Sequence, residues 1–569
     1  MLKQHNKICR LTALLLALTC ICTLAPSVLA DPTAAADYSD TIVRTGLAYG
    51  SGSLAAANFQ VASGTGTGFE AGYYGSDRLF VPLYTIAGET ELTVIRSQNY
   101  SLASSSYVAD GTEGSNVVGA YHIELDLSFE DQSALDEAVS AVYSATNYFS
   151  YPAYTSSGYR VRVGRYTSRE AAENDLPVIF ERVSAVYPGI QLSVVGMGTN
   201  AYTVLRTGTK HILYEHDGAT RQLGIQAIGG DKPETWHKGY KYYGGFDFGN
   251  TSRTSMAVIS VARLSDYVKG VTPYELNTNW PEESLKAHAL CAQTFAITNR
   301  NRHASYGFDV CTGQHCQVYR GTTLLTQKII NCVDAVEGQI ITYNGKPIDA
   351  VYHSSNGGWT EDSENVWVAR VPYLRSVTDT YESLSFENNG LWETSITSAQ
   401  LTAKLNANGH AIGPVTSVSI AKLTPAGSVY SLNISDGTKT VTLSKENMRM
   451  VIGTSVLLSQ NFRLVNDGKI FLNDGDTMVS SLAGLSVLNG NGETTTLSSS
   501  TPSVLTGSGT ETLNPGESDT SVFRFSGKGW GHSLGLSQIG SRGMARLGWT
   551  YDQIIHYYYT GVTITGLDN

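Results

Sequence analysis

The clearest pattern along the chain is a strand followed by a helix, and it occurs twice. In residues 121–142, apolar side chains alternate with acidic ones before an alanine-containing helical pattern begins. Residues 159–180 repeat this arrangement with arginines at the polar positions. Alternation with a period of two is typical of a half-buried strand. Together with strands expected at 192–195 and 202–205, the pattern predicts a small α+β region over residues 116–206.

Short strands are also predicted on both sides of this region. Residues 31–115 alternate short apolar runs with glycine and serine clusters, which indicates strands joined by loops. Residues 500–519 are polar and rich in glycine, proline and serine, so we expect a long loop there. Alternating patterns predict further strands at 255–262, 339–343, 415–423, 429–434 and 438–443.

One helix has a close-packed face. Pro281 suits its first helical position, because the missing N–H costs nothing there, and Glu283 suits the positive end of the helix dipole. Its apolar face is mostly alanine and consists of Leu285, Ala289, Ala292 and Ala296. Such a helix is a rigid platform, and Glu275 lies just before it in a segment that reads as a turn after Pro273.

The first thirty residues are typical of a secretory signal. Lys3, Lys7 and Arg10 precede an apolar run over 11–24, which is short for a membrane span. A small-residue cleavage site before Asp31 predicts export, and an uncleaved membrane anchor is the alternative. We therefore expect a protein that is extracellular or associated with the cell wall.

Length and charge narrow the class further. A chain of 569 residues is too long for one hydrophobic core, so the predicted fold class is a strand-rich, multidomain α+β protein whose last domain covers 207–569. Loss of the three basic residues in the signal lowers the formal net charge from −11 to −14. This charge argues against nucleic acid as a partner and is compatible with a neutral sugar polymer.

The four cysteines that follow the expected signal are confined to one segment of the chain. They fall within 42 positions of one another, at Cys291, Cys311, Cys316 and Cys332. Cys311, His315 and Cys316 combine thiols and an imidazole, which are the ligands that Zn²⁺ prefers. The alternative is a disulfide between Cys311 and Cys316, or pairing with the other two cysteines.

The stretch YVKGVTPYE…WPEESLKAHALCAQTFA resembles the signature of the SpoIID/LytB family of cell-wall proteins. Its sporulation members are lytic transglycosylases that cut peptidoglycan glycan strands. The resemblance implies that Glu275 is the catalytic acid, although Leu276 and Asn277 stand where the family usually has Met and Pro. It also implies that some members carry zinc at a Cys/His cluster of this kind.

Two further segments are similar to family motifs. Residues 352–361 resemble a Y-x-S-x-x-G-G-x-T-E loop, and residues 527–538 resemble G-x-G-x-G-H-G-V-G-M-S-Q, with Ser533 in place of a glycine. Small polar groups there suit sugar hydroxyls, although such loops also satisfy their own hydrogen bonds. The substrate-contact candidates are Lys286, Gln317, Tyr319, His353, Ser354, Ser355, Asn356, Gly357, Gly358, Glu361, Gly529, His532 and Gln538.

The resemblance implies a reaction that needs a single acid. In a lytic transglycosylase the C6 hydroxyl of the substrate attacks C1 and leaves a 1,6-anhydro sugar, so one carboxyl serves as acid and then base. Expected partners are peptidoglycan glycan strands, other wall hydrolases such as an amidase, and sporulation membrane proteins. A non-catalytic wall-binding modifier of an autolysin and a hydrolytic muramidase remain alternatives.

A second resemblance concerns the α+β region. The sequence YRVRVGRYTSREAAENDL resembles the opening of a SPOR domain, a module that binds glycan strands without peptides. The match is best over 155–206, and Pro177 interrupts the expected helix. A packing module without a ligand is the alternative.

Overall fold

The computed structural model describes residues 38–566, apart from short gaps at 104–105, 110–115, 197, 199, 386–389, 466–469, 472–477, 480–481, 489–491, 499–502, 507–508 and 513–520. The expected signal at 1–30 lies outside the described residues. Among the helices that are described, none is long and apolar enough to cross a bilayer.

A seven-stranded sheet joins the N-terminal strands to later parts of the chain, in the order β20-β1-β19-β18-β15-β3-β4. Strand β1 pairs antiparallel with β19 and parallel with β20. The strands expected in residues 31–115 therefore share a sheet with strands beyond residue 207. The members are β1 (Ile42–Ala48), β3 (Gly68–Tyr74), β4 (Phe80–Ala87), β15 (Gly224–Ile228), β18 (Gly245–Asn250), β19 (Met256–Arg263) and β20 (Val310–Cys311).

A ten-stranded sheet follows the order β12-β9-β11-β10-β14-β13-β5-β2-β16-β17. Its strands are β2 (Ala56–Val61), β5 (Glu91–Arg96), β9 (Tyr121–Leu125), β10 (Ser150–Thr155), β11 (Gly158–Tyr166), β12 (Leu192–Val195), β13 (Tyr202–Arg206), β14 (Ile212–Asp217), β16 (Thr235–His237) and β17 (Tyr240–Tyr242). A small sheet beside it contains β6 (Tyr100–Ala103), β7 (Ser106–Ala109) and β8 (Val117–Val118), and η1 covers Gly50–Gly52.

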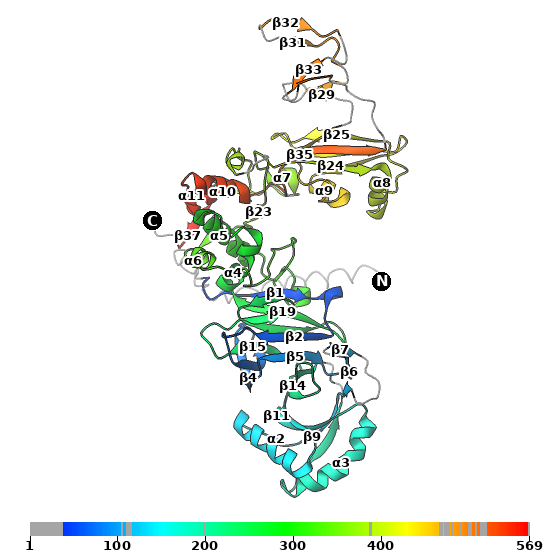
Figure 1. Cartoon of the computed structure of the whole chain (residues 1–569), viewed down its shortest axis with the longest axis vertical. Coiled ribbons are helices and arrows are strands. Elements are labelled where there is room, and N and C mark those ends of the chain that lie inside the picture. The colour runs from blue at the N-terminus through cyan, green and yellow to red at the C-terminus, as the bar shows by residue number, and fades with distance from the viewer. Residues whose placement is uncertain are drawn as a thin grey trace, which may run out of the picture. The chain divides into compact units, whose positions relative to one another are not determined.

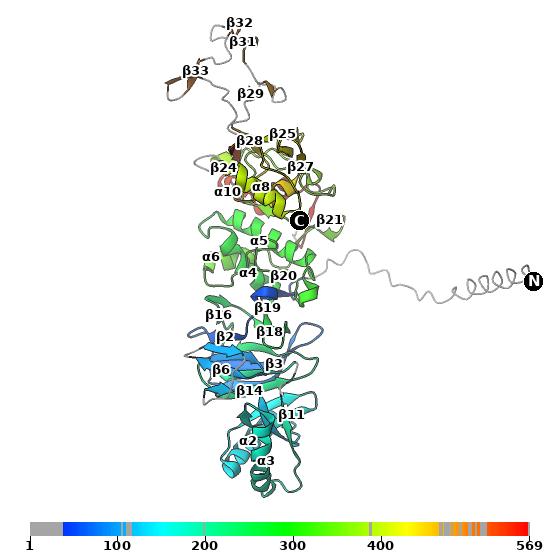
Figure 2. The same ribbon diagram turned by 90° about the vertical axis from the view of Figure 1, so that its right-hand side faces the viewer.

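The predicted α+β region forms one edge of this sheet. Helices α2 (Gln132–Thr146) and α3 (Arg169–Ser184) lie side by side against its strands (Figure 2). The elements from β9 to β12 follow the order β-α-β-β-α-β, which is the split βαβ arrangement. Asp131 and Ser168 cap the two helices, and Pro177 lies inside α3 without ending it.

Five helices form one group, in which α4 packs against β1 and β19 and α5 packs against the other four helices (Figure 1). The segment before Glu275 is helical and not a turn as expected: α4 covers Leu264–Glu275 with Pro273 inside it. Helix α5 covers Glu282–Thr298, so Pro281 precedes its first residue. The other members are α6 (Gln327–Asp334), α10 (Gln538–Arg546) and α11 (Tyr551–Tyr558).

Short elements surround these helices. They are η2 (Ala304–Tyr306), β21 (Ile340–Tyr343), β22 (Lys346–Pro347), β23 (Tyr352–His353), α7 (Ser363–Val366), η3 (Glu382–Leu384), β36 (Leu536–Ser537) and β37 (Thr563–Thr565). Strand β23 pairs parallel with β36. This pairing brings the 352–361 loop beside the C-terminal glycine-rich motif, because the two strands lie within those motifs.

A separate hydrophobic core forms between the two motif loops. It contains β24 (Leu391–Thr397), α8 (Ser398–Ala407), β25 (Ser417–Leu423), β26 (Val429–Ser435), β27 (Thr440–Ser444), α9 (Glu446–Ile452), β28 (Phe462–Leu464) and β35 (Val522–Lys528). The meander expected at 415–443 is thus present.

Three two-stranded hairpins lie between β28 and β35 along the chain. They pair β29 (Ile470–Phe471) with β30 (Met478–Val479), β31 (Ser486–Leu488) with β32 (Thr494–Thr496), and β33 (Ser503–Thr506) with β34 (Gly509–Thr512). The last hairpin falls within the long loop expected at 500–519. The other residues of that loop lie outside the described part of the chain. The strand-rich α+β fold class is confirmed.

Candidate active site

Glu275 is the last residue of α4 and is half-buried. Oε1 accepts a hydrogen bond of 2.8 Å from the backbone N–H of Val318. Oε2 accepts a weaker one of 3.4 Å from Nε2 of Gln538, at the start of α10. The end of one helix, the loop after the cysteines and the start of another helix therefore meet at this carboxylate.

A chain of hydroxyl and amide groups leads from the core to Glu275. The Tyr267 hydroxyl donates to Oε1 of Gln317 at 2.8 Å, and Nε2 of Gln317 donates to the Tyr352 hydroxyl at 3.2 Å. The Tyr352 hydroxyl in turn forms a hydrogen bond with the Glu275 carboxylate. Gln317 is 1% exposed, so it orients Tyr352 and does not face solvent.

Burial raises the pKa of the Glu275 carboxyl above its usual range. The hydrogen bonds from Val318, Gln538 and Tyr352 favour the charged form, but they offset this effect only in part. No cation is among the groups that act on this pKa. Burial thus shifts this carboxyl toward its protonated form, which is the direction that a general acid needs.

Glu382 was not anticipated from the sequence, and it connects the two motif loops. Its buried carboxylate accepts hydrogen bonds from the Ser355 hydroxyl at 2.8 Å and from the N–H groups of Asn356 and Gly357 at 2.7 and 2.8 Å. It also accepts a bond from the hydroxyl of Ser537, the N-cap of α10. One carboxylate thus fixes the loop and the start of the helix that carries Gln538.

The two motif histidines pack against each other, with ring centroids 5.6 Å apart. His353 is 4% exposed, and its Nδ1 lies 3.0 Å from the Leu534 carbonyl. Burial lowers the pKa of His353 to about 4 and lowers that of His532 well below its usual value. His532 is less covered, and its Nδ1 accepts the N–H of Leu534 at 3.0 Å. Both rings are neutral near pH 7.

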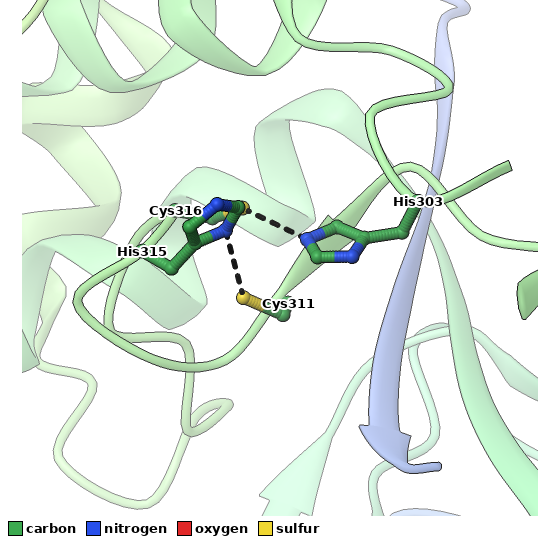
Figure 3. A group of neighbouring side chains, drawn as sticks. All are labelled: His303, Cys311, His315 and Cys316. Atoms are coloured by element: carbon green, nitrogen blue, oxygen red, sulfur yellow. Dashed lines mark hydrogen bonds between the residues drawn. The ribbon is translucent and has the colours of Figure 1, made fainter. Parts of the chain in front are cut away.

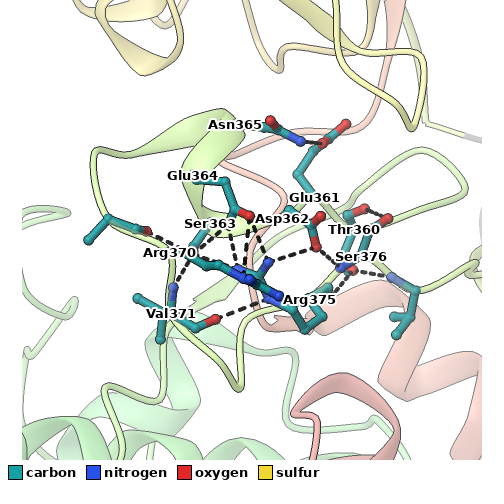
Figure 4. A network of polar contacts seen from close by, with 12 residues as sticks. Thr360, Glu361, Asp362, Ser363, Glu364, Asn365, Arg370, Val371, Arg375 and Ser376 are labelled. Carbon is teal, nitrogen blue, oxygen red and sulfur yellow. Dashed lines mark hydrogen bonds and ion pairs between the residues drawn. The ribbon is translucent and has the colours of Figure 1, made fainter.

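Glu361 belongs to a network that holds its own loop (Figure 4). Its carboxylate accepts bonds from Thr424 at 2.9 Å and Asn365 at 3.3 Å, and it is 1% exposed. Beside it, Arg375 donates two hydrogen bonds to Glu364 at 2.9 and 2.6 Å. Glu361 thus fastens the loop to the separate core that follows it, and its contacts are with protein groups.

The remaining candidates divide by their surroundings. Tyr319 is 2% exposed, stacks on Tyr267 and bonds Ser260, so it lies in the core. Lys286 pairs with Glu283 at 2.7 Å on the side of α5. Ser355, Asn356, Gly529 and Gln538 are buried, whereas Ser354, Gly357, Gly358 and His532 keep partial exposure.

Backbone geometry at the second motif explains most of its glycines. At Gly529 a Cβ atom would lie 2.7 Å from the Asn356 carbonyl carbon, so a side chain is excluded there. Ser533 has a φ of 60°, the left-handed region that a glycine would adopt without strain. The family-like glycine position is thus geometrically present, although a serine occupies it.

The predicted metal-ligating residues come together with a fourth residue (Figure 3). His303, Cys311, His315 and Cys316 offer ligand atoms that all lie within 4.8 Å of one another. Sγ of Cys316 lies 3.4 Å from Nε2 of His303 and 3.5 Å from Nδ1 of His315. His303 precedes η2, and it was missed because the sequence cluster starts only at residue 311.

This donor set fits zinc. Tetrahedral Zn²⁺ bonds sulfur at ~2.3 Å and nitrogen at ~2.0–2.1 Å, which sets neighbouring donors roughly 3.3–3.8 Å apart. The four cysteines of the described chain are free thiols, so the disulfide alternative is not formed here. The hydrogen bond between Cys311 and Cys316 lowers the pKa of the Cys311 thiol and raises that of Cys316.

A close-packed helix, a carboxyl whose pKa is raised by burial and two glycine-rich loops meet at this candidate site. Comparison with known proteins places the same segment in a cell-wall-related family. The SpoIID family, described as Stage II sporulation protein, matches residues 252–343, which include Glu275 and all four residues of the Cys/His cluster.

Three relatives illustrate the extent of the similarity. The chain is 28% identical over 334 residues to stage II sporulation protein D of Bacillus subtilis, covering 56% of this chain and 78% of that protein. It is 30% identical over 315 residues to the amidase enhancer of Bacillus subtilis, covering 52% of this chain and 40% of that protein. It is 27% identical over 330 residues to an uncharacterised protein of Brachyspira hyodysenteriae, covering 57% of this chain and 73% of that protein. These similarities support the resemblance to the SpoIID/LytB family, and the family model matches residues 252–343 of this chain.

Proposed function

We propose that this protein acts on the cell wall as an exported peptidoglycan lytic transglycosylase, with Glu275 as the general acid and base. The observation that carries this proposal is the half-buried Glu275, whose carboxyl has a pKa raised by burial and only neutral hydrogen-bond donors around it. The relatives named stage II sporulation protein D and amidase enhancer support a role at the cell wall.

The reaction balances with this one group. Glu275 donates its proton to the oxygen that leaves as the bond between N-acetylmuramic acid and N-acetylglucosamine breaks. The C6 hydroxyl of the muramic acid then attacks C1, and the Glu275 carboxylate takes the hydroxyl proton. The product is a 1,6-anhydro sugar, and the enzyme returns to its protonated state. The Tyr352 hydroxyl and the Val318 N–H stabilise the carboxylate between the two steps.

Product analysis tests the proposal. Purified, peptide-free glycan strands are incubated with the wild type, Glu275→Gln and Glu282→Gln, and the products are analysed by mass spectrometry. Glu282 is an exposed glutamate in the first turn of α5 and is a matched control. We expect anhydro-ended products with the wild type and the control, and a loss of roughly 10²–10⁴-fold with Glu275→Gln.

Two alternatives give different results in the same experiment. Reducing-end products in place of anhydro ends indicate a hydrolytic muramidase. If the wild type releases no products but a partner amidase cuts faster in its presence, the protein is a non-catalytic modifier. The name of the amidase enhancer motivates the second arm.

The Cys/His cluster is proposed to hold a structural Zn²⁺. The support is the set of two thiols and two imidazoles at ligand spacing. A bound ion would fix the loop from Cys311 to Cys316, and Val318, which donates to Glu275, follows two residues later. The residues of the cluster would thereby hold one wall of the acid site in place.

Metal analysis of the purified full chain tests this proposal. One zinc per chain is expected for the wild type, with loss in His303→Ala and in Cys311→Ser. Cys332→Ser is the control, because this buried thiol lies outside the cluster. Retention of the metal in both cluster variants would discard the site.

The βαββαβ unit over 121–195 is proposed to act as a SPOR-like module that binds peptide-free glycan. The order of its elements supports this proposal. Binding of the full chain to purified cell wall is measured before and after an amidase has removed the stem peptides, and tighter binding to the treated wall is expected. Equal binding to both forms of the wall contradicts it.

A further inference from the structure

A pocket of about 740 Å³ lies on the seven-stranded sheet. Its floor includes Gly249, Ala257 and Ile259 of β18 and β19. On β18, Phe246 and Phe248 are fully buried in the core, so the alternate residues face the opposite side. The pocket therefore lies on the face of the sheet that turns away from the core, and small side chains keep it open.

The pocket is separate from the candidate active site. Its lining residues include neither Glu275 nor any residue of the Cys/His cluster or the two motif loops. Tyr306 and Gly307 of its wall do follow His303 closely in the chain. It is thus a distinct site beside the segment that carries one cluster histidine.

Aromatic and charged groups line this pocket. Tyr73 and Tyr74 come from β3, and Tyr306 from η2. On the floor, Arg44 and Asp247 form an ion pair, so their charges compensate each other.

Arg221 adds a positive charge that is not neutralised. Its guanidinium stacks on the Tyr73 ring at 4.8 Å and donates to the Tyr154 hydroxyl at 3.3 Å. Among the described residues, no carboxylate pairs with Arg221, and its side chain is exposed. A cationic, aromatic-lined pocket with a small-residue floor therefore has an unpaired guanidinium at its edge.

We propose that this pocket binds an acidic sugar of the glycan strand. Sugar rings present apolar faces that pack on tyrosine rings, and a guanidinium recognises a carboxylate with paired hydrogen bonds. The choice of ligand rests on the proposed function: muramic acid carries a lactyl carboxylate, which is free only where the stem peptide has been removed. The pocket would therefore select peptide-free strands at a distance from the cutting site.

Isothermal titration of the full chain tests the pocket. All proteins carry Glu275→Gln, so that no cleavage occurs during the measurement. The ligands are a tetrasaccharide of alternating N-acetylglucosamine and N-acetylmuramic acid with free lactyl groups, and an N-acetylglucosamine tetrasaccharide without carboxylates. The pocket variants are Arg221→Gln and Tyr73→Ala. Their matched controls are Arg370→Gln and Tyr143→Ala, since both side chains are exposed elsewhere.

The acidic tetrasaccharide is expected to bind at two sites, the pocket and the candidate active site. Arg221→Gln should weaken its binding at the pocket by roughly tenfold, because a charge-assisted hydrogen bond is lost. Tyr73→Ala should weaken the acidic and neutral ligands, and the controls should change neither. Thermal unfolding confirms that each variant is folded. If both pocket variants bind the acidic tetrasaccharide as tightly as the protein with Glu275→Gln alone, the proposal is overturned.

The two proposals fail separately. Anhydro products that depend on Glu275, together with unchanged binding in the pocket variants, reject only the pocket. Absence of such products, together with loss of the acidic ligand in Arg221→Gln, rejects the reaction and keeps the pocket.

Discussion

Two glutamates in different regions of the molecule show how surroundings assign a carboxyl its role. Glu275, at the end of α4, is partly exposed and has only neutral donors around it. Glu215, in β14 of the ten-stranded sheet, is fully buried but pairs with Arg162 at 3.0 Å and lies 3.5 Å from His122. The first carboxyl has no counter-ion among the groups that act on it, whereas the second is held by an ion pair inside the sheet.

Burial acts on both groups, and the presence of a cation decides the outcome. Burial raises the pKa of Glu275. It would also raise that of Glu215, but attraction by His122 and Arg162 outweighs it and lowers the pKa below its usual range. A buried carboxylate with a counter-ion is therefore a structural element, and a carboxyl without one is a candidate acid.

The largest effect is expected from removing the charge of Glu215. Glu215→Gln removes the fully buried carboxylate that pairs with Arg162 and His122, and Arg162 keeps its ion pair with Glu124 at 2.7 Å. Because one partner of a buried ion pair is lost, the free energy of unfolding should fall by roughly 3–5 kcal/mol. Because the pKa of Glu215 is depressed in the fold, its contribution is complete above the unfolded pKa and is lost as the pH falls through the folded value.

Urea unfolding of the full chain at pH 7 measures this difference. Glu275→Gln is the counterpart, and its stability should be close to that of the wild type because it has no ion pair to break. Equal destabilisation by the two substitutions would remove the distinction between them.

A smaller loss of stability is expected from substitution of Glu382, which is buried like Glu215 but, like Glu275, has no cation beside it. It is buried without a cation, and burial raises its pKa. Glu382→Gln replaces one accepting oxygen by an NH₂ group among four donors, which should lower stability by about 1–3 kcal/mol and reduce activity. Because Glu382 acts through the loops, kcat should fall more than KM rises.

The control for Glu382 is Glu393→Gln, an exposed glutamate on β24. Calorimetry and steady-state kinetics with soluble glycan measure the two effects. An unchanged kcat in a folded Glu382→Gln variant contradicts the positioning role.

The smallest effect concerns the pH dependence of Glu275. The Tyr352 hydroxyl favours the carboxylate and lowers its pKa, so Tyr352→Phe should raise that pKa further. The rate should then persist to higher pH, with the falling limb displaced upward by about one pH unit or less. Cleavage rates measured between pH 4 and pH 9 test this prediction, with Tyr343→Phe as the control. A falling limb displaced to lower pH would contradict the predicted direction of the pKa change.

Local patterns in the sequence predicted many of the helices and strands of this fold. Alternation predicted the strands of the α+β region, and the spacing of Leu285, Ala289, Ala292 and Ala296 predicted the buried face of α5, where all four are 0% exposed. These predictions held because each depends on the period of one element. The segment before Glu275 was misread because Pro273 suggests a turn, whereas its ring is accommodated near the end of α4.

By itself, the sequence determined which residues are chemically able to act: the acid at Glu275, the thiols at Cys311 and Cys316, and the glycine-rich motifs. Only the tertiary structure decided which neighbours they have. His303 joins the cluster, Tyr352 reaches the acid, and Glu382 ties two loops that are about 180 residues apart, because β23 pairs with β36. Such contacts follow from how the chain packs in space, which no local period records.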